Sequence, residues 1–285
     1  MKRYINILFL ISGSILMAAQ SSAQRSKNYK DLQDALRKPD SVEWLTLHDQ
    51  HLINFPEDIL KLKNLKYLDL SNNRITQLPE NFGSLKNLFY LDLSGNQLES
   101  LPTSLGGIQT LRNLYLDYNK PHNLASDIEI LARLPLLRVL NISGDSIREL
   151  PASIGKLKNL EYLELSENQI SSLPEEFSNL KNLQILYINN DKFFDLRHNL
   201  PILGKLPGLK ELHLEGDHFK AIPNEIKNLK SLEYLYLNNN SLQELPREVF
   251  QLKKLKFIDV TNNRMPHILL DQYRDEFAST IRIRF

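Results

Sequence analysis

The sequence predicts an α/β solenoid: a right-handed horseshoe of ten repeats with a parallel β-sheet on its concave side and a cap at each end. The first observation is the pattern L-x-x-L-x-L-x-x-N-x-L, which recurs ten times. The units begin at Val42, Leu65, Leu88, Leu111, Leu137, Leu160, Leu183, Leu209, Leu232 and Leu255. A unit of about 23 residues cannot close a core alone, so stacked neighbours must share one continuous core.

The second observation is the alternation inside each unit. Apolar residues at the fourth and sixth places alternate with polar ones, which is the period of a β-strand. Parallel strands need a crossover of a dozen or more residues, and a 23-residue unit supplies it.

The third observation is that every third unit is longer. Most starts are 23 residues apart, but those at Leu111 and Leu183 are followed by steps of 26, and a further 26 from Leu255 reaches Ile281. The shorter units carry a proline in their second half, for which we expect an extended run, and the longer ones lack it. For the longer units we expect short convex helices over 126–134, with Ser126 as the cap, and over 200–206 and 268–277.

The segment LKNLKYLDLSNNRITQLPENFGS, residues 62–84, shows the pattern most fully. It resembles the leucine-rich repeat family, specifically its 23-residue type with an L-P-x-x-h-x-x-L second half. The resemblance covers 42–285. It implies one short parallel strand per repeat on a concave sheet, a loop, turn or short helix on the convex side, and recognition of a partner rather than catalysis.

The ninth place of each unit is polar, and the sequence predicts that these side chains are buried and bond main-chain groups of adjacent turns, which lose their sheet partners there. The ten residues are Gln50, Asn73, Asn96, Asn119, Asp145, Asn168, Asp191, Asp217, Asn240 and Asn263.

The two ends differ from the repeats, which span 42–265. Residues 1–23 have a basic start, an apolar stretch and small residues before the junction, which predicts a cleaved secretory signal peptide. Residues 24–41 are expected to form a helical cap with Tyr29, Leu32, Ala35 and Leu36 on one face. Residues 266–285 are expected to form a helix followed by an edge strand as the second cap.

The amino-acid composition excludes several classes of function. The chain has no cysteine, which excludes disulfides, thiol nucleophiles and zinc–thiolate sites. Without residues 1–23 it carries 33 basic against 34 acidic side chains, and this balance argues against nucleic-acid binding. No nucleophile elbow, phosphate loop or metal motif occurs, and His48 with His51 are better explained as turn residues than as ligands. We therefore expect a non-enzymatic protein without cofactor or metal, exported and soluble, in the periplasm or secreted.

The side chains expected on the concave face, at places two, three, five, seven and eight of each unit, indicate what kind of partner the protein binds. The forty residues at places three, five, seven and eight include nine acids and no lysine or arginine, whereas basic residues recur at place two, along one rim. This predicts an acidic, tyrosine-rich strip with a basic edge, suited to a protein or peptide partner with basic groups and not to nucleic acid or a membrane span. The alternative is that the aromatic columns only stabilise the sheet and the charges only face solvent.

Two groups of residues ahead of the longer units are the candidate contact sites, because tyrosine and carboxylate together are typical of binding hot spots. They are Phe89, Tyr90, Asp92, Tyr115, Asp117 and Tyr118, and then Tyr162, Glu164, Glu167 and Tyr187. Two other functions stay open: a structural spacer in the envelope, and a binder of glycan or peptidoglycan fragments.

Overall fold

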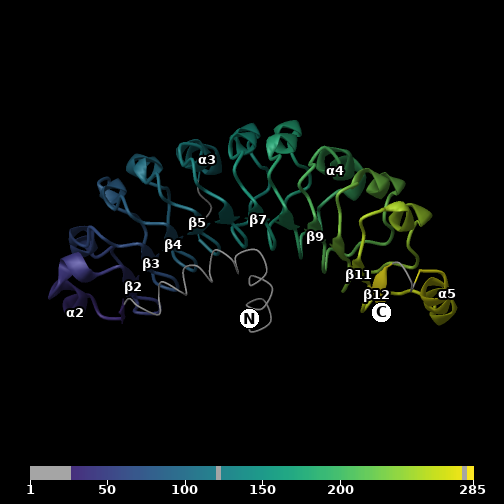
Figure 1. Cartoon of the computed structure of the whole chain (residues 1–285), viewed down its shortest axis with the longest axis horizontal. Coiled ribbons are helices and arrows are strands. Elements are labelled where there is room, and N and C mark those ends of the chain that lie inside the picture. The colour runs from purple at the N-terminus through teal and green to yellow at the C-terminus, as the bar shows by residue number, and fades with distance from the viewer. Residues whose placement is uncertain (1–26, 120–122, 278–280) are drawn as a thin grey trace.

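The computed structural model describes residues 27–119, 123–277 and 281–285; the expected signal peptide lies outside them. The chain forms an arch with strands along its inner, concave side and helices along its outer, convex side (Figure 1). A single parallel sheet of 12 strands runs in sequence order from β1 to β12. The predicted horseshoe of stacked repeats with a parallel concave sheet is confirmed.

Each repeat contributes one three-residue strand at places three to five. The ten are β2 Trp44–Thr46, β3 Tyr67–Asp69, β4 Tyr90–Asp92, β5 Asn113–Tyr115, β6 Val139–Asn141, β7 Tyr162–Glu164, β8 Ile185–Tyr187, β9 Glu211–His213, β10 Tyr234–Tyr236 and β11 Phe257–Asp259. Neighbouring strands pair in the same register, as Leu68 with Leu91 shows. Residues at one place therefore form a column across the sheet, with steps of about 4.8 Å.

The three longer units carry α-helices as expected: α3 Leu124–Leu131, α4 Leu196–Leu203 and α5 His267–Phe277. Their starts differ from the prediction. Asn123, not Ser126, caps α3: its side chain accepts a hydrogen bond from the Ser126 backbone N–H, so Ser126 lies inside the first turn. In α4 the cap is Asp195, and Pro201 lies within the helix.

The shorter units are not extended throughout, which corrects the expectation from their prolines. Most of these prolines instead precede one turn of 3-10 helix, because proline lacks the N–H that a first turn leaves unbonded. The turns are Glu57–Lys61, Phe82–Ser84, Thr103–Gly107, Ala152–Lys156, Glu175–Asn179, Asn224–Asn228 and Arg247–Gln251.

The core runs unbroken through the arch between sheet and convex turns. Leucines at places one, four and six, such as Leu65, Leu68 and Leu70, have no exposed surface. Phe82 and Phe177 fill the space beneath the convex turns and are also fully buried. Because each unit buries its apolar side chains against the next, the concave side chains are held on a rigid scaffold.

The ninth-place side chains form a polar ladder through this core. Asn168 Oδ1 accepts hydrogen bonds from the backbone N–H groups of Asp145 and Ile147, and its Nδ2 donates to the carbonyls of Ile142 and Leu165. The predicted role is therefore confirmed for the asparagines. Gln50, in the first repeat, is the exception: it is exposed and donates to the Lys30 carbonyl.

The N-terminal cap contains a strand as well as a helix. β1 Asn28–Tyr29 pairs with β2, and α2 Leu32–Leu36 packs Ala35 fully into the core. Tyr29 therefore lies on the strand, not on the helical face expected from its spacing.

The C-terminal cap has the expected order of helix and edge strand. β12 Arg282–Arg284 pairs with β11. The Tyr273 phenol of α5 bonds the Leu245 backbone, accepting from its N–H at 3.0 Å and donating to its carbonyl at 3.2 Å. Among all the described residues, no helix combines the length and the apolar character that crossing a membrane requires.

Candidate functional site

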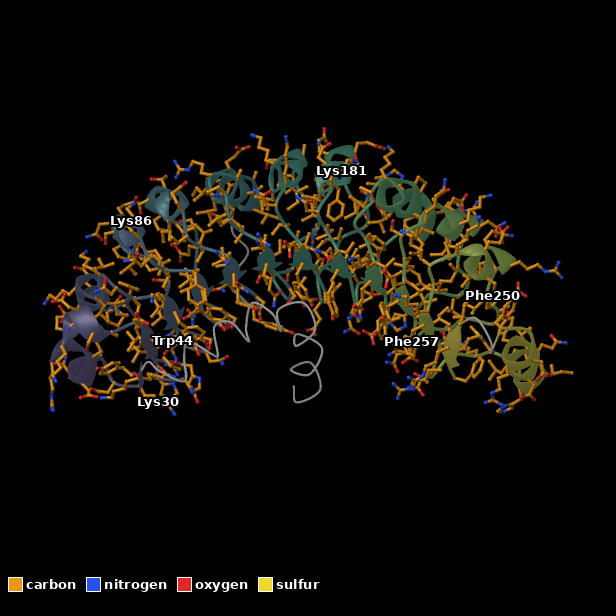
Figure 2. All side chains as sticks on the ribbon, in the orientation of Figure 1. Lys30, Trp44, Lys86, Lys181, Phe250 and Phe257 are labelled. Carbon is orange, nitrogen blue, oxygen red and sulfur yellow. The ribbon has the colours of Figure 1, made fainter. Side chains whose placement is uncertain are left out.

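The concave face carries two ladders of stacked aromatic rings. The first joins Trp44, Tyr67, Tyr90 and Tyr115 on β2 to β5, with ring centroids 4.6, 4.2 and 5.3 Å apart in that order. It moves from place three to place five between Tyr90 and Tyr115. Trp44 lies on the inner side of the arch, whereas Lys86 and Lys181 lie on its outer side (Figure 2).

The second ladder joins Tyr162, Tyr187, His213, Tyr236 and Phe257 on β7 to β11. Its closest stacking surrounds His213, whose ring lies 3.7 Å from Tyr187 and 4.1 Å from Tyr236 by centroid. Only β6 separates the two ladders, since Val139 and Asn141 occupy its aromatic places.

His213 is buried within the second ladder, and both of its ring nitrogens face carboxylates. Its Nε2 lies 2.8 Å from a Glu211 carboxylate oxygen and its Nδ1 lies 3.2 Å from one of Glu215. Burial opposes the charged ring, but the hydrogen bonds to Glu211 and Glu215 prevail and raise the pKa of His213. When protonated, His213 neutralises part of the acidic charge on this half of the face.

Three carboxyl groups on the units of β4 to β7 have raised pKa values. Burial raises the pKa of Asp92 to about 6, against hydrogen bonds from Ser94. Burial and the nearby Asp92, Asp145 and Glu164 carboxylates raise the pKa of Asp117 to about 7. Burial also raises the pKa of Glu164, although hydrogen bonds from Ser166 and Tyr162 and the charge of His213 oppose this rise. These three carboxyl groups lie on the units of β4, β5 and β7.

A bridge over β6 links the units on either side of it. All ten place-eight residues have φ between 55 and 75°, a conformation that favours glycine and asparagine. Tyr118 and Glu167 nevertheless occupy it, and their side chains share a hydrogen bond. Tyr118 is half exposed and lies against Gly144, where an added Cβ would stand 2.5 Å from the ring. Two strained backbones therefore hold one exposed ring over β6.

The structure thus brings most of the predicted residues into one surface rather than two. Tyr115, Asp117 and Tyr118 stand on one side of β6, and Tyr162, Glu164 and Glu167 stand on the other. Beyond them lie Tyr90 and Asp92 on β4 and Tyr187 on β8. Phe89 is the exception, because it lies at the rim with its ring edge against Trp44, 6.2 Å away.

Sequence reasoning missed the His213 network. The signal was present in Glu211-Leu-His213-Leu-Glu215, where three titratable residues alternate on one face of a strand. The network was missed because only lysine and arginine were counted as basic residues at the concave positions.

The expected basic edge at place two is neutralised in part. Glutamates at the same place in neighbouring repeats pair with the basic side chains. The pairs are Lys66 with Glu43 at 2.7 Å, Arg138 with Glu161 at 2.6 Å and Lys256 with Glu233 at 2.5 Å. Such partly exposed pairs contribute little stability, but they neutralise three of the five basic side chains at this rim. Lys210 bonds the neutral Gln184 instead and keeps its charge.

Within the described part of the chain, no three His, Cys, Asp or Glu side chains are grouped so that they could hold a metal ion. What the concave face offers is aromatic surface, hydrogen-bond acceptors and negative charge.

Comparison with known proteins identifies the family. A sequence profile of the leucine-rich repeat region matches residues 45–126, 109–195 and 191–272, most of the chain. The chain belongs to the leucine-rich repeat family. Such a repeat fold indicates an interaction module. No curated protein matches this chain significantly.

The solved structures of internalin C2 and TLR13 confirm the fold of this leucine-rich repeat protein. Internalin C2 of Listeria monocytogenes is 24% identical with a TM-score of 0.53, over 78% of this chain and 82% of that one. The TLR13–ssRNA13 complex is 24% identical with a TM-score of 0.67, and the match spans 86% of this chain but 41% of TLR13. A leucine-rich repeat protein of Leptospira interrogans is 24% identical over 91% of this chain and all of its own, with a TM-score of 0.44.

Proposed function

We propose that this protein is a non-enzymatic interaction module that binds a protein or peptide with basic groups on its concave face. The observation that carries the proposal is the set of carboxyl groups at Asp92, Asp117 and Glu164. Each has a raised pKa, and no lysine or arginine stands at the forty central concave positions. Crowding buried acids together away from lysine and arginine costs free energy that a cationic ligand would recover.

The same surface disfavours the other ligand classes. Phosphates of a nucleic acid such as the RNA in the TLR13 complex would be repelled by the acidic centre. A glycan needs free ring faces, but most rings of the ladders are stacked on one another. A spacer role does not explain the raised pKa values of the carboxyl groups or the strained backbones of Tyr118 and Glu167.

We also propose that the protein is exported and that its signal peptide is removed after Ala23. The support is the basic, apolar and small-residue order of residues 1–23. Mass spectrometry of the exported protein tests this: a chain beginning at Gln24 is expected, and a chain that keeps residues 1–23 inside the cytoplasm would contradict it.

The binding proposal is tested with the mature chain as bait on envelope and host extracts, followed by calorimetry with the partner recovered. The Asp92→Ala/Tyr115→Ala variant changes the concave face, and Lys86→Ala/Lys181→Ala is the matched change on the convex side. We expect the concave variant to weaken binding by about 1–3 kcal/mol and the convex variant to leave it unchanged. Equal binding by the wild type and the concave variant would refute the proposal.

A further inference from the structure

His213 makes two carboxylate contacts that only a charged ring can satisfy together. Its Nε2 lies 2.8 Å from an oxygen of Glu211, and its Nδ1 lies 3.2 Å from an oxygen of Glu215. A neutral imidazole has one N–H, so its other nitrogen would present a lone pair to a carboxylate, whereas an imidazolium donates from both nitrogens. The contacts of both carboxylates therefore depend on the protonation of one ring.

The ring is fixed, whereas the two carboxylates reach the solvent. Tyr187 on β8 and Tyr236 on β10 stack on the two faces of His213, with ring centroids 3.7 and 4.1 Å away. The side chain of His213 is 2% exposed, but those of Glu211 and Glu215 are 15% and 24% exposed. The two carboxylates can therefore contact the buried ring and also a cation that comes from the open side of the face.

The Glu215 carboxylate is held in place by other residues as well. Asn189 on the unit of β8 donates to it from Nδ2 at 3.1 Å. Burial opposes the ionised form, but the hydrogen bonds from His213, Asn238 and Asn189 prevail and lower the pKa of Glu215. Glu215 therefore stays ionised near neutral pH, and two of its donors remain when His213 loses its proton.

We propose that His213 is an internal counter-ion that controls a second contact for the partner, in which Glu211 and Glu215 hold a lysine or arginine side chain. While the ring is protonated, the two carboxylates already share a cation. When the ring is neutral, their charge is available to the partner. The proposal rests on the proposed function, and it adds a contact on β9 to the contact at β4 to β7.

The direction of the pH effect follows from the groups that face the ring. The hydrogen bonds to Glu211 and Glu215 prevail over burial and raise the pKa of His213 above 6.5. Burial raises the pKa of Tyr187 and of Tyr236, so both phenols stay neutral up to pH 9. As pH rises from 6 to 9, the only change next to the two carboxylates is therefore the loss of the His213 proton, and their affinity for a cation increases.

The other titratable groups on neighbouring strands do not reverse this direction. Glu164 on β7 carries a negative charge that His213 also senses. Tyr234 on β10 pairs in register with Glu211, and Asp259 on β11 forms an ion pair with Arg284 at 3.3 Å. Because binding and protonation are linked, a cation bound at the two carboxylates must in turn favour the neutral ring.

The probe is the capped tripeptide acetyl-Gly-Lys-Gly-amide, whose single ammonium occupies one contact at a time. The same peptide with neutral Nε-acetyl-lysine is the comparison. NMR follows binding at the ring protons of Tyr236 and protonation at the Cε1 proton of His213. We expect the lysine peptide to bind beside Tyr236 about tenfold more tightly at pH 9 than at pH 6 and to lower the pH midpoint of the His213 titration. The neutral peptide should do neither.

The variant His213→Gln keeps a hydrogen-bond donor next to the carboxylates but is uncharged at every pH. We expect it to bind the lysine peptide at pH 6 about as tightly as the wild type does at pH 9, with no pH dependence at Tyr236. His218→Gln is the matched control, because it makes the same change at an exposed histidine of the same repeat, and it should keep the wild-type dependence. If His213→Gln does not fold by circular dichroism, the effect of the peptide on the wild-type His213 titration decides, since it needs no variant.

Two results would overturn the role of His213: a titration that the lysine peptide leaves unchanged, or the same pH dependence at Tyr236 in a folded His213→Gln variant as in the wild type. A lysine peptide that perturbs the Tyr115 ring but not the Tyr236 ring at pH 9 would overturn the second contact alone. A lysine peptide that perturbs neither ring would overturn the proposed function as well.

Discussion

Replacing Asp217 with asparagine should stabilise the protein, and more so at higher pH. Asp217 stands in the polar ladder at the place where Asn168 makes four hydrogen bonds and Asn240 makes five. Its Oδ1 accepts the Asp191 backbone N–H at 2.6 Å, but its Oδ2 has no partner. Burial, with the Asp191 and Glu215 carboxylates nearby, raises the pKa of Asp217 from 3.8 to about 8.

The direction and the size of the change in folding stability follow from this pKa shift. The unfolded chain releases the proton near its ordinary pKa and the folded chain near 8, so folding takes up a proton between these values. Stability of the wild type therefore falls as pH rises through this window. At 1.36 kcal/mol per pKa unit, the upper bound of the loss is about 2 kcal/mol at pH 5 and about 5 kcal/mol at pH 7.5. Relaxation around the carboxylate reduces this, and we expect a gain of about 2 kcal/mol for Asp217→Asn at pH 7.5.

Urea unfolding at pH 5 and 7.5 measures the effect as a shift in midpoint, because solenoids can depart from two-state behaviour. The matched control is Asn168→Asp, the reverse change at the same place of another repeat, which should destabilise increasingly with pH. A midpoint shift for Asp217→Asn that is equal at both pH values, or a lower midpoint at pH 7.5, would refute the reasoning.

Three further changes test the scaffold and the face. Asn168→Ala removes four buried hydrogen bonds and should lower the free energy of unfolding by about 3 kcal/mol in urea titrations; an unchanged midpoint would contradict the ladder. Gly83→Ala should destabilise by more than about 2 kcal/mol, since its Cβ would lie 2.0 Å from the Ser104 carbonyl oxygen, and a wild-type melting temperature would disprove the close contact. Asp117→Asn should raise stability at pH 8 while weakening partner binding; a stability loss would show that Asp117 supports the fold instead.

The repeating part of the fold could be predicted from the sequence because each place has one physical role. A leucine at place four, such as Leu68, must be buried, and an asparagine at place nine must bond the backbone. The spacing of these residues alone therefore predicts both the register of neighbouring strands and the polar ladder. The additional three residues of the longer units likewise predicted α3, α4 and α5.

Features that depend on contacts between particular side chains could not be predicted. Asn123 and Ser126 both suit a helix cap, and only the path of the turn decides between them. Tyr29 fits a helical face by spacing but completes the sheet edge.

The candidate site was predicted in part. The sequence predicted which tyrosines and acids face inward, but not that the aromatic column changes place between Tyr90 and Tyr115. Nor did it predict that His213 stacks between two tyrosines, or that Tyr118 and Glu167 join across β6, since these depend on side-chain rotamers.

The central claim is that a partner binds the concave face at β4 to β7. A photo-reactive benzoylphenylalanine at Tyr118 would report contact there, because that ring is half exposed over β6, and the same group at Lys181 would report the convex side. Cross-linking in living cells, read by mass spectrometry, should give a partner adduct from position 118 and none from position 181. The same adduct from position 181, with none from position 118, would contradict the account.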